Sequence, residues 1–383
     1  MKPSDEPFSE PRGARPEDLR PVVDLINRAL LHPSHKGGDM HEHFPVLFSD
    51  ENLANCRIIT AAGRPVSHVA YLVRDALIAG PSITTALLGA VCTDPAYRGR
   101  GLASRVLDDC EARMRRQGVD VAIISGGRGL YRRRGARRVG ICRGFEMTGG
   151  EPVLRGDQPP GIREGALSDR PSLARLYDRR DVRFVRPASD WDRWLQSSYS
   201  GLAVWPLYVG LRDGHITAYV LIRPSDGEDT PRGDAYEWAG RAEDVAALLA
   251  ALPELWGGRV TVKAEVGADD DLIELLEAAG LSAEPTQLSR TVKVLRPAAL
   301  FEKLRPHLPA PASEVEVEPT RDEGARFKLG GADLALPVED LGPLFFGDLE
   351  GEVTGKLDAA GELGAVLRAA LPFPLPRYGY DYT

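Results

Sequence analysis

Two arginines and two glycines alternate in the segment Arg98-Gly99-Arg100-Gly101, and a helix-forming pattern follows directly. Glycine accepts the backbone conformations of a tight turn and lets a ligand approach the main chain closely. The first amides of a helix carry partial positive charge, and the two guanidinium groups add full charges. This combination predicts a site for a diphosphate or a similar anion.

A second residue capable of chemistry is Tyr131, in the segment LYRRRG at residues 130–135. A phenol can donate a proton to a leaving group. Tyrosines also serve as packing residues, with an apolar ring and a polar tip, so the residue alone leaves both roles open.

The elements around these residues place them at one end of a sheet. The apolar run from Leu87 to Thr93 predicts a buried strand, which Asp94-Pro95 ends because proline lacks the backbone N–H of a strand ladder. Apolar residues then recur at helical spacing, at Ala103, Val106, Leu107, Cys110 and Met114. We expect this helix to end at Gly118 and the next strand to span Val119 to Ser125.

The loop does not fit two familiar phosphate-binding patterns. It lacks the lysine and the Ser/Thr of a P-loop, and its spacing is not G-x-G-x-x-G. Its pattern is R-x-x-G-x-A, from Arg98 through Gly101 to Ala103. This loop resembles the acyl-CoA diphosphate loop of the GNAT acetyltransferase superfamily, whose pattern is Q/R-x-x-G-x-G/A. GNAT enzymes also often carry a tyrosine beside the thioester sulfur, at the point where Tyr131 stands here.

The resemblance implies acetyl-CoA as cosubstrate and assigns residues to it. The strand before the loop would hold the pantetheine through its backbone, the loop would hold the diphosphate, and the end of the next strand would complete the site. The residues so assigned are Val91, Cys92, Thr93, Arg98, Gly99, Arg100, Gly101, Leu102, Ala103, Ser125 and Gly126.

Composition bounds the class of protein. A chain of 383 residues exceeds one ordinary core, which predicts two or three domains. The four cysteines show no metal-ligand spacing and are expected to be reduced thiols in a cytoplasm. No apolar run approaches the ~20 residues of a membrane span, and residues 1–13 lack the apolar core of a signal peptide. The net charge of −8 argues against general nucleic-acid binding and is compatible with a cationic substrate.

Two clusters of basic side chains have alternative interpretations. The segment from residue 32 to residue 50 holds four histidines, which could form a metal site, although no second ligand cluster supports one and a substrate-pocket lid is favoured. These are His32, His35, His41 and His43. Six arginines follow the second predicted strand, and we favour a solvated face for them over nucleic-acid binding, with one or two near the CoA 3′-phosphate. They are Arg128, Arg132, Arg133, Arg134, Arg137 and Arg138.

The first 150 residues follow the element order of a GNAT fold. A helix from Pro16 to Leu31 precedes a hairpin formed by residues 57–62 and 66–73, and a short strand is expected from Gly140 to Met147. After a Pro- and Gly-rich linker at residues 151–164, this order recurs without the R-x-x-G-x-A loop. Carboxylates such as Glu243 and Asp244 would repel a diphosphate there, so this second unit is expected to form one wall of a substrate cleft.

The last hundred residues extend the resemblance. A strand at Thr291 to Leu295 begins a third unit, and the chain ends in a tail with three alternate prolines and three tyrosines, which is expected to be extended and docked. Two GNAT-like units followed by a sterol-carrier-protein-like domain resemble the layout of the enhanced intracellular survival (Eis) type of acetyltransferase. In that type the tyrosine acts as general acid and the C-terminal carboxylate as base, which implies these roles for Tyr131 and Thr383. The better-known members end in phenylalanine, so Thr383 departs from them.

The sequence therefore predicts an α/β fold with mixed sheets and three domains. A catalytic GNAT domain is expected at residues 1–150, a degenerate GNAT-like domain at 151–290, and a sterol-carrier-protein-like domain at 291–383. The expected activity is acetyl transfer from acetyl-CoA to a primary amine, aminoglycoside- or polyamine-like, without metal, nucleic acid or membrane. A peptide or protein amine is the alternative acceptor, and a non-catalytic CoA-binding sensor is the alternative function. The resemblance also implies a homo-oligomer, a hexamer.

Overall fold

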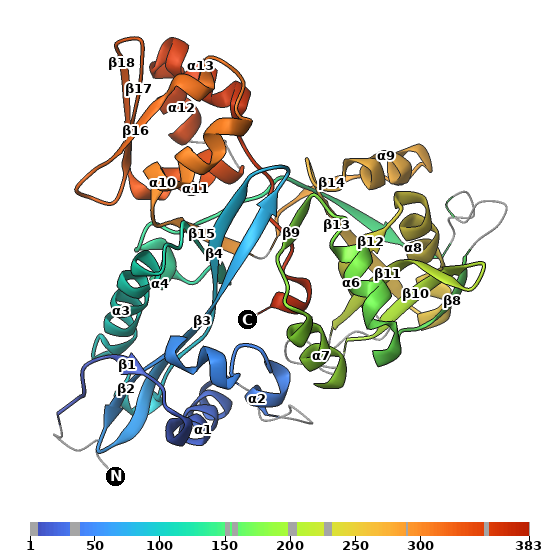
Figure 1. Cartoon of the computed structure of the whole chain (residues 1–383), viewed down its shortest axis with the longest axis horizontal. Coiled ribbons are helices and arrows are strands. Elements are labelled where there is room, and N and C mark those ends of the chain that lie inside the picture. Colours follow the sequence, from blue (N-terminus) through green and yellow to red (C-terminus); the bar gives the residue numbers. More distant parts are fainter. Residues whose placement is uncertain are drawn as a thin grey trace.

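A computed structural model describes residues 7–30, 39–149, 154, 160–197, 205–225, 232–288, 290–347 and 352–382. Its strands form three sheets, of eight, seven and three strands. Figure 1 shows two larger units side by side and a smaller unit at one end. The α/β class with mixed sheets is as the sequence predicted.

The first sheet has the order β1-β2-β3-β4-β5-β15-β6, and β9 also pairs with β3. Its strands are β1 (Arg12–Gly13), β2 (Cys56–Ala61), β3 (Arg64–Ile78), β4 (Ser82–Thr93), β5 (Val121–Ser125), β6 (Arg137–Arg138), β9 (Val182–Phe184) and β15 (Arg290–Val294). Neighbours are antiparallel except β4 and β5, which run parallel. A parallel pair requires a crossover, which α3 (Leu102–Arg116) supplies.

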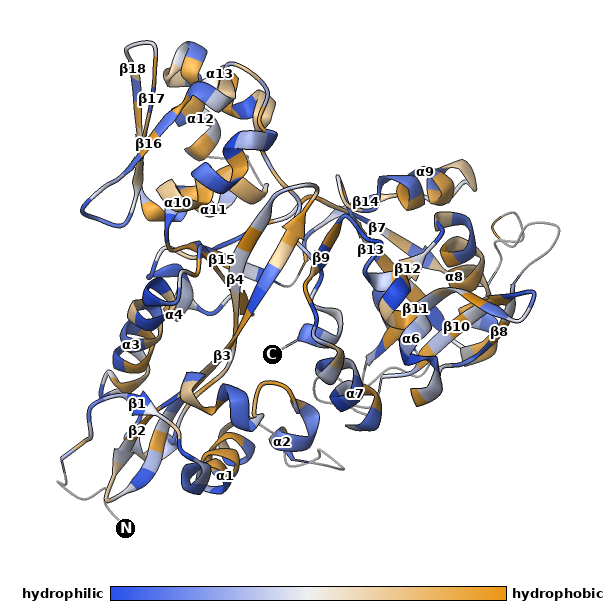
Figure 2. Ribbon diagram, in the orientation of Figure 1, coloured by the Kyte–Doolittle hydropathy of each residue, from blue (hydrophilic) through white to orange (hydrophobic). Residues whose placement is uncertain are grey.

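Helices cover both faces of this sheet. Successive side chains of a strand point to opposite faces, so Val69 and Tyr71 of β3 pack in the core that includes the buried residues of α3. Ala70 and Leu72 pack in the core that includes α1 (Leu19–Leu30). Figure 2 shows apolar and polar residues alternating along both helices, as expected for helices with one buried side. The predicted helix at Pro16 begins with one 3-10 turn before α1.

The second sheet has the order β14-β7-β13-β12-β11-β10-β8. Its strands are β7 (Cys142–Met147), β8 (Gly161–Glu164), β10 (Leu207–Arg212), β11 (His215–Ser225), β12 (Arg232–Gly240), β13 (Arg259–Glu265) and β14 (Glu284–Thr286). The helices of this unit are α6 (Arg170–Tyr177), α7 (Ala188–Ser197), α8 (Ala242–Trp256) and α9 (Asp270–Ala278). Here β12 and β13 are the parallel pair, and α8 connects them.

Both large sheets contain strands from across the predicted boundaries: the first sheet takes β9 and β15, and the second takes β7. β7 was expected to close the first domain, but it pairs with β13 in the second sheet. β15 was expected to open the third domain, but it lies between β5 and β6 in the first sheet. The predicted boundaries at residues 150 and 290 follow linker composition, whereas each sheet completes its ladder with a strand from across a boundary. Neither large sheet is therefore built from one predicted segment alone.

The third unit packs four helices on a small antiparallel sheet. Its strands are β16 (Glu316–Pro319), β17 (Ala325–Leu329) and β18 (Ala332–Leu336). Its helices are α10 (Pro297–Leu304), α11 (Val338–Phe346), α12 (Glu352–Ala359) and α13 (Gly361–Ala370). The buried rings of Phe301, Phe327 and Phe345 lie with centroids 6.3 to 6.5 Å apart and form its centre.

Residues 371–382 form a tail that leaves the third unit and runs between the two larger ones (Figure 1). Leu375, Tyr378 and Tyr380 are buried. Gly379 has a positive φ of 51° at the start of a 3-10 turn (Gly379–Asp381), and a Cβ there would overlap the carboxylate of Glu237. The tail is docked, as predicted, although it ends in this turn and is not extended throughout.

Candidate active site

The parallel strands β4 and β5 separate at one end. Their pairing ends where Leu88 lies opposite Ile124, while β4 continues beyond it. Ala90 has a positive φ of 50°, beside a shift in the register between β3 and β4. Such a bulge redirects a strand, so backbone groups of β4 leave the ladder with β5. The predicted pantetheine residues on this diverging segment are Val91, Cys92 and Thr93.

Side chains at this end of the sheet are occupied with packing. Cys92 is buried, and burial raises the pKa of its thiol to about 12, so the thiol stays protonated. The hydroxyl of Ser125 donates to the carbonyl of Leu88 at 3.5 Å. Gly126 follows with a φ of 115° and open space where a Cβ would stand. Backbone groups rather than side chains are therefore what this opening offers to a ligand.

The loop from β4 to α3 is exposed and built on two left-handed glycines. Asp94 begins it by accepting a hydrogen bond from the amide of Ala96 at 2.9 Å. Gly99 and Gly101 have φ values of 77° and 74°, and nothing lies within 4 Å of the position of a Cβ on either. Gly101 is the N-cap of α3, which Leu102 anchors in the core. The N-terminus of α3 thus opens to solvent, as an anion site requires.

The two arginines of the loop have different surroundings. Arg98 donates to the carbonyl of Thr93 at 3.3 Å, which ties the loop back to the end of β4. The guanidinium of Arg100 lies 5.8 Å from the ring centre of Phe8 and 5.6 Å from that of Tyr97. Both arginines are exposed, so both charges remain available to an anion at the start of α3.

Tyr131 lies on the short helix α4 (Gly129–Arg132) that follows β5. Only 4% of the residue is exposed, and burial raises the pKa of its phenol. A phenol with a raised pKa keeps its proton at neutral pH, as a general acid must. The structure therefore places this predicted residue just beyond the opening between β4 and β5.

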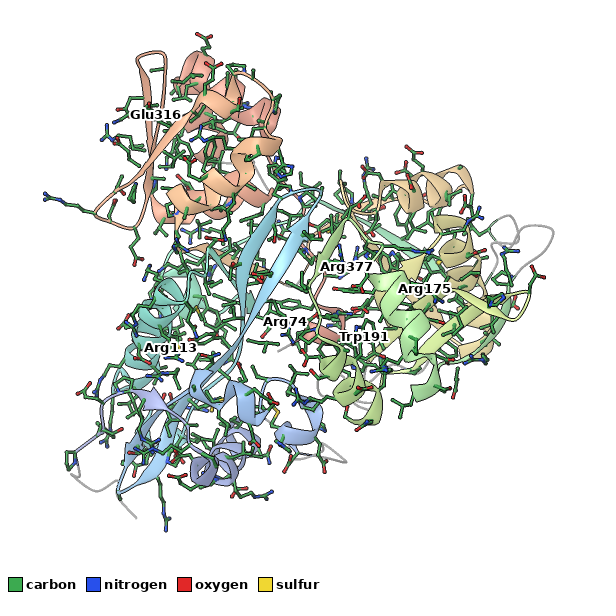
Figure 3. The ribbon with its side chains drawn as sticks, in the orientation of Figure 1. Arg74, Arg113, Arg175, Trp191, Glu316 and Arg377 are labelled. Atoms are coloured by element: carbon green, nitrogen blue, oxygen red, sulfur yellow. The ribbon has the colours of Figure 1, made fainter. Side chains whose placement is uncertain are left out.

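Ion pairs to both large units fix the tail. Asp381 pairs with Arg74 of β3 at 3.1 Å and with Arg186 at 2.7 Å, and all three residues are buried. Arg377 pairs with Asp269 at 2.8 Å. Figure 3 places Arg74 and Arg377 between the two large units. Pairs of this kind fix geometry, because breaking one leaves a charge buried without a partner.

Aromatic rings surround the last described residues. Tyr380 stacks on Trp194 with ring centres 5.6 Å apart. The ring centre of Tyr382 lies 6.2 Å from that of Phe44 in the first unit. It lies 6.2 Å from that of Trp205 and 6.0 Å from that of Tyr236 in the second unit. The predicted base, the carboxylate of Thr383, lies outside the described residues. Its role as base therefore stays a prediction. The residue before it, Tyr382, contacts aromatic rings of both large units.

Sequence reasoning missed two residues near this centre. Burial raises the pKa of Tyr378 in the tail, and nearby Tyr131 adds to that shift. His68 of β3 hydrogen bonds through Nδ1 to the carbonyl of Ala90 at 2.9 Å, and burial lowers its pKa to about 4, so the ring is neutral. Neither residue belongs to a motif. Each is buried by residues distant in the sequence, which is why sequence reasoning did not find them.

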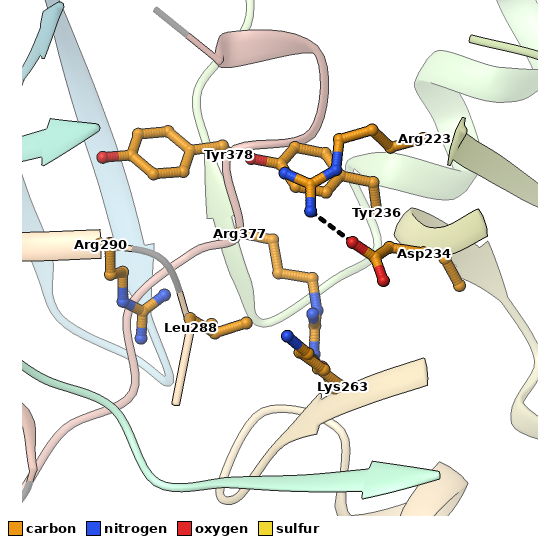
Figure 4. Close-up of a pocket in the computed structure, with 9 residues that line it drawn as sticks. Arg223, Asp234, Tyr236, Lys263, Leu288, Arg290, Arg377 and Tyr378 are labelled. Carbon is orange, nitrogen blue, oxygen red and sulfur yellow. Dashed lines mark hydrogen bonds and ion pairs between the residues drawn. The ribbon is translucent and has the colours of Figure 1, made fainter. Parts of the chain in front are cut away.

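A small pocket lies beside the tail (Figure 4). It is bounded by β11, β12 and β13 of the second sheet, by the start of β15, and by tail residues. The lining residues are Arg223, Asp234, Ala235, Tyr236, Lys263, Leu288, Arg290, Arg377 and Tyr378. The expectation that the second unit walls a substrate cleft stays a prediction, for which this pocket is a candidate location.

The basic clusters noted in the sequence do not form a metal centre within the described ranges. No group of three or more His, Cys, Asp or Glu side chains there could hold a metal ion, and His32 and His35 lie outside those ranges. Of the six arginines, Arg134 is partly buried and pairs with Asp108 at 2.6 Å and with buried Glu111 at 2.8 Å, so it has a structural role. Four others are exposed: Arg128, Arg132, Arg133 and Arg138. No described helix is long and apolar enough to cross a membrane.

Comparison with known proteins supports the first unit directly. Residues 10–139 match the family model of the acetyltransferase (GNAT) domain, which contains the loop and Tyr131. No curated protein matches the sequence. The predicted resemblance to GNAT enzymes is confirmed for this part of the chain.

Solved structures share the fold over nearly the whole chain. A GCN5-related N-acetyltransferase from Anabaena variabilis has a TM-score of 0.66 at 15% identity, covering 97% of this chain and 99% of that one. A GCN5-related N-acetyltransferase from Kribbella flavida has a TM-score of 0.63 at 15% identity, with 97% of both chains covered. Eis1 from Mycobacterium abscessus has a TM-score of 0.63 at 14% identity, covering 96% and 98%. These similarities extend over all three units of the chain. At these identities the likeness shows the fold, and the family match at residues 10–139 shows the GNAT domain.

Proposed function

We propose that the protein transfers an acetyl group from acetyl-CoA to a primary amine. The observation that carries this proposal is the opening between β4 and β5, which ends at the exposed Gly99–Gly101 loop on one side and at buried Tyr131 on the other. The GNAT domain match implies acyl-CoA binding in general, and the acetyl group is our proposal.

The chain's own residues supply binding and proton transfer. The loop from Arg98 to Ala103 holds the diphosphate through backbone amides and two guanidinium groups. The diverging backbone of β4 at residues 91–93 holds the pantetheine. Acetyl-CoA supplies an activated acyl carbonyl when bound. Tyr131 holds a proton on its phenol oxygen, ready for the departing thiolate.

The attacking amine must also lose a proton, because an ordinary ammonium group has a pKa of about 10.4. We propose the carboxylate of Thr383 as the base, which the tail's ion pairs and aromatic contacts support by fixing the preceding residues between the two units. His68 offers a neutral imidazole, but a pKa of about 4 makes it a weak base.

The alternative is a CoA-binding protein without turnover. Incubation with acetyl-CoA and a panel of amines, with release of free thiol monitored, distinguishes the two, and the panel includes aminoglycosides, polyamines, peptides and small amino acids. We expect thiol release that depends on one amine class and falls about 100-fold in Tyr131→Phe. Acetyl-CoA binding without thiol release for any amine would leave the CoA-binding sensor as the function.

Homo-oligomeric assembly, a cytoplasmic location and the sterol-carrier-like nature of the third unit stay predictions.

A further inference from the structure

The pocket beside the tail is strongly basic. Its lining includes four cationic side chains, from β11, β13, β15 and the tail, and a single carboxylate, Asp234. The four are Arg223, Lys263, Arg290 and Arg377. Figure 4 shows these side chains converging from separate elements, with Arg290 and Arg377 on either side of Leu288. This charge is opposite in sign to the net charge of the whole chain.

Carboxylates neutralise this charge only in part. Arg223 pairs with Asp234, Arg290 pairs with buried Glu265, and Arg377 pairs with Asp269. Asp269 is itself shared with a further arginine, Arg180. Lys263 has no hydrogen bond or ion pair from its ammonium group to any described residue. The pocket and its ion-pair partners therefore contain more cations than carboxylates.

Two of the guanidinium groups also hold unused donors. The Nε atoms of Arg290 and Arg377 are buried and have no acceptor within the described part of the chain. Arg290 is only 1% exposed, so bulk water does not reach its Nε atom to accept a hydrogen bond. A buried donor without an acceptor destabilises the folded protein, and an anionic ligand oxygen would supply the missing acceptor.

The pocket adjoins the reaction centre. Arg290 lies opposite Ser125 in the ladder between β15 and β5, at the end of β5 where the opening between β4 and β5 lies. Tyr378 lines the pocket, and the proximity of Tyr131 contributes to its raised pKa. A ligand in the pocket would therefore lie near the end of β5, on the side of the second unit.

We propose that this pocket binds an acidic group, a carboxylate or a phosphate, on the acceptor amine. The acceptor is then a small amine that carries its own anion, and Lys263 with the arginines selects it. Polyamines and aminoglycosides, which lack an anion, would meet like charge there. This inference rests on the proposed function and narrows its acceptor class.

The test compares matched acceptors at saturating acetyl-CoA. Phosphoethanolamine is compared with ethanolamine, and amino acids with their carboxamides, by kcat/KM from thiol release. We expect the acidic member of at least one pair to be preferred about tenfold or more, which also identifies phosphate or carboxylate as the group. Lys263→Met keeps the side-chain length and removes the charge, so most of this preference should be lost, mainly through a higher KM for the acidic member. Lys328→Met, on the sheet of the third unit, makes the same charge change and should keep the preference.

The outcomes separate the two proposals. Faster turnover of polyamines or carboxamides than of acidic amines, or a preference that Lys263→Met leaves intact, overturns the acidic acceptor while the acetyltransferase stands. If acetyl-CoA binds and no amine is acetylated, the proposed function fails, and calorimetry with inorganic phosphate and citrate tests the pocket by itself. Weaker anion binding in Lys263→Met than in Lys328→Met supports an anion pocket, and equal binding overturns it.

Discussion

The two large units contain the same strand–helix–strand element and use it differently. In each unit a parallel pair of strands shares four register pairs and then separates, after Leu88 and Ile124 in the first unit and after Ala235 and Val262 in the second. In the first unit the diverging strand leads to two left-handed glycines and an open helix N-terminus. In the second unit the chain's own side chains occupy the corresponding gap.

Arginine and aspartate fill the gap in the second unit. Arg180 donates to the carbonyl of Trp238 at 2.9 Å and to Asp269 at 2.8 Å. Arg377 from the tail donates to the carbonyl of Lys263 and to Asp269, and its guanidinium lies 4.0 Å from the ring centre of Trp238. One carbonyl from each separated strand thus accepts a hydrogen bond from an arginine, so these two carbonyls are not free to bind a pantetheine.

The same strand–helix–strand element therefore has different surroundings in the two units. In the first unit β4 continues beyond its pairing with β5 and leads to an exposed loop. In the second unit the same geometry holds the tail. Strands β7 and β15 join the two units in one structure, because each pairs in the sheet across a predicted boundary.

Placing a charged side chain at Gly101 should produce the largest effect. Gly101→Glu puts a carboxylate at the diphosphate site and forces a side chain into a left-handed conformation, which costs about 1–2 kcal/mol. We expect calorimetry to show at least a 100-fold loss of acetyl-CoA affinity in a folded protein.

Gly214→Glu is the matched control for this change. Gly214 also has a positive φ, 77°, with open space at its Cβ, but lies in the turn between β10 and β11 of the second unit. It should lose similar stability and keep acetyl-CoA affinity. Equal affinity of wild type and Gly101→Glu would exclude this loop as the diphosphate site.

The sequence predicted those features of the two units that depend on residues close together in the chain, and missed those that depend on distant residues. The loop, its glycines and the helix after it are local, and residues 94–118 were sufficient to predict them. The absence of a matching loop at Glu243 and Asp244 was also visible. The Arg180–Asp269–Arg377 network was not, because its members are up to 197 residues apart and meet only after both sheets and the tail are in place. The strand pairing across the predicted boundaries was missed for the same reason, since composition marks linkers and not hydrogen-bonding partners.

Extending the tail by one alanine after Thr383 should have the next largest effect. The extension keeps every native side chain and moves the terminal carboxylate by about 3.5 Å. If that carboxylate is the base, kcat should fall by about 10²–10⁴-fold, with acetyl-CoA affinity and Tm little changed. Thr383→Phe retains the carboxylate at the same backbone position and should retain most of the activity. A wild-type kcat in the extended protein would show that another group removes the proton.

Removing the charge of Asp269 tests how much the ion pairs between the separated strands of the second unit stabilise the fold. Asp269→Asn leaves Arg180 and Arg377 without their shared carboxylate, and such a loss typically costs about 3–5 kcal/mol. Urea unfolding at pH 7 should show a destabilisation of this size. Asp270→Asn, at an exposed neighbouring position, is the control and should change stability little.

The pH dependence of this destabilisation has a defined sign. The two guanidinium groups lower the folded-state pKa of Asp269 below its usual value. The wild-type carboxylate therefore stabilises the fold above the unfolded pKa of about 3.9, and that contribution is lost as pH falls toward the folded pKa. The stability difference between wild type and Asp269→Asn should shrink as pH is lowered below about 4. A difference that stays constant down to the acid transition would mean that packing, and not charge, makes Asp269 important.

The last prediction concerns the number of acetyl-CoA molecules that each chain binds, which we expect not to rise above one in any variant. Because side chains occupy the gap of the second unit, calorimetric titration should give one acetyl-CoA per chain, and Gly101→Glu should reduce that number to zero rather than reveal a weaker second site. Asp269→Asn should not raise it, because Arg180 still reaches the carbonyl of Trp238 and Glu243 and Asp244 remain at the start of α8. A second equivalent that survives Gly101→Glu would show that the second unit has kept a donor site.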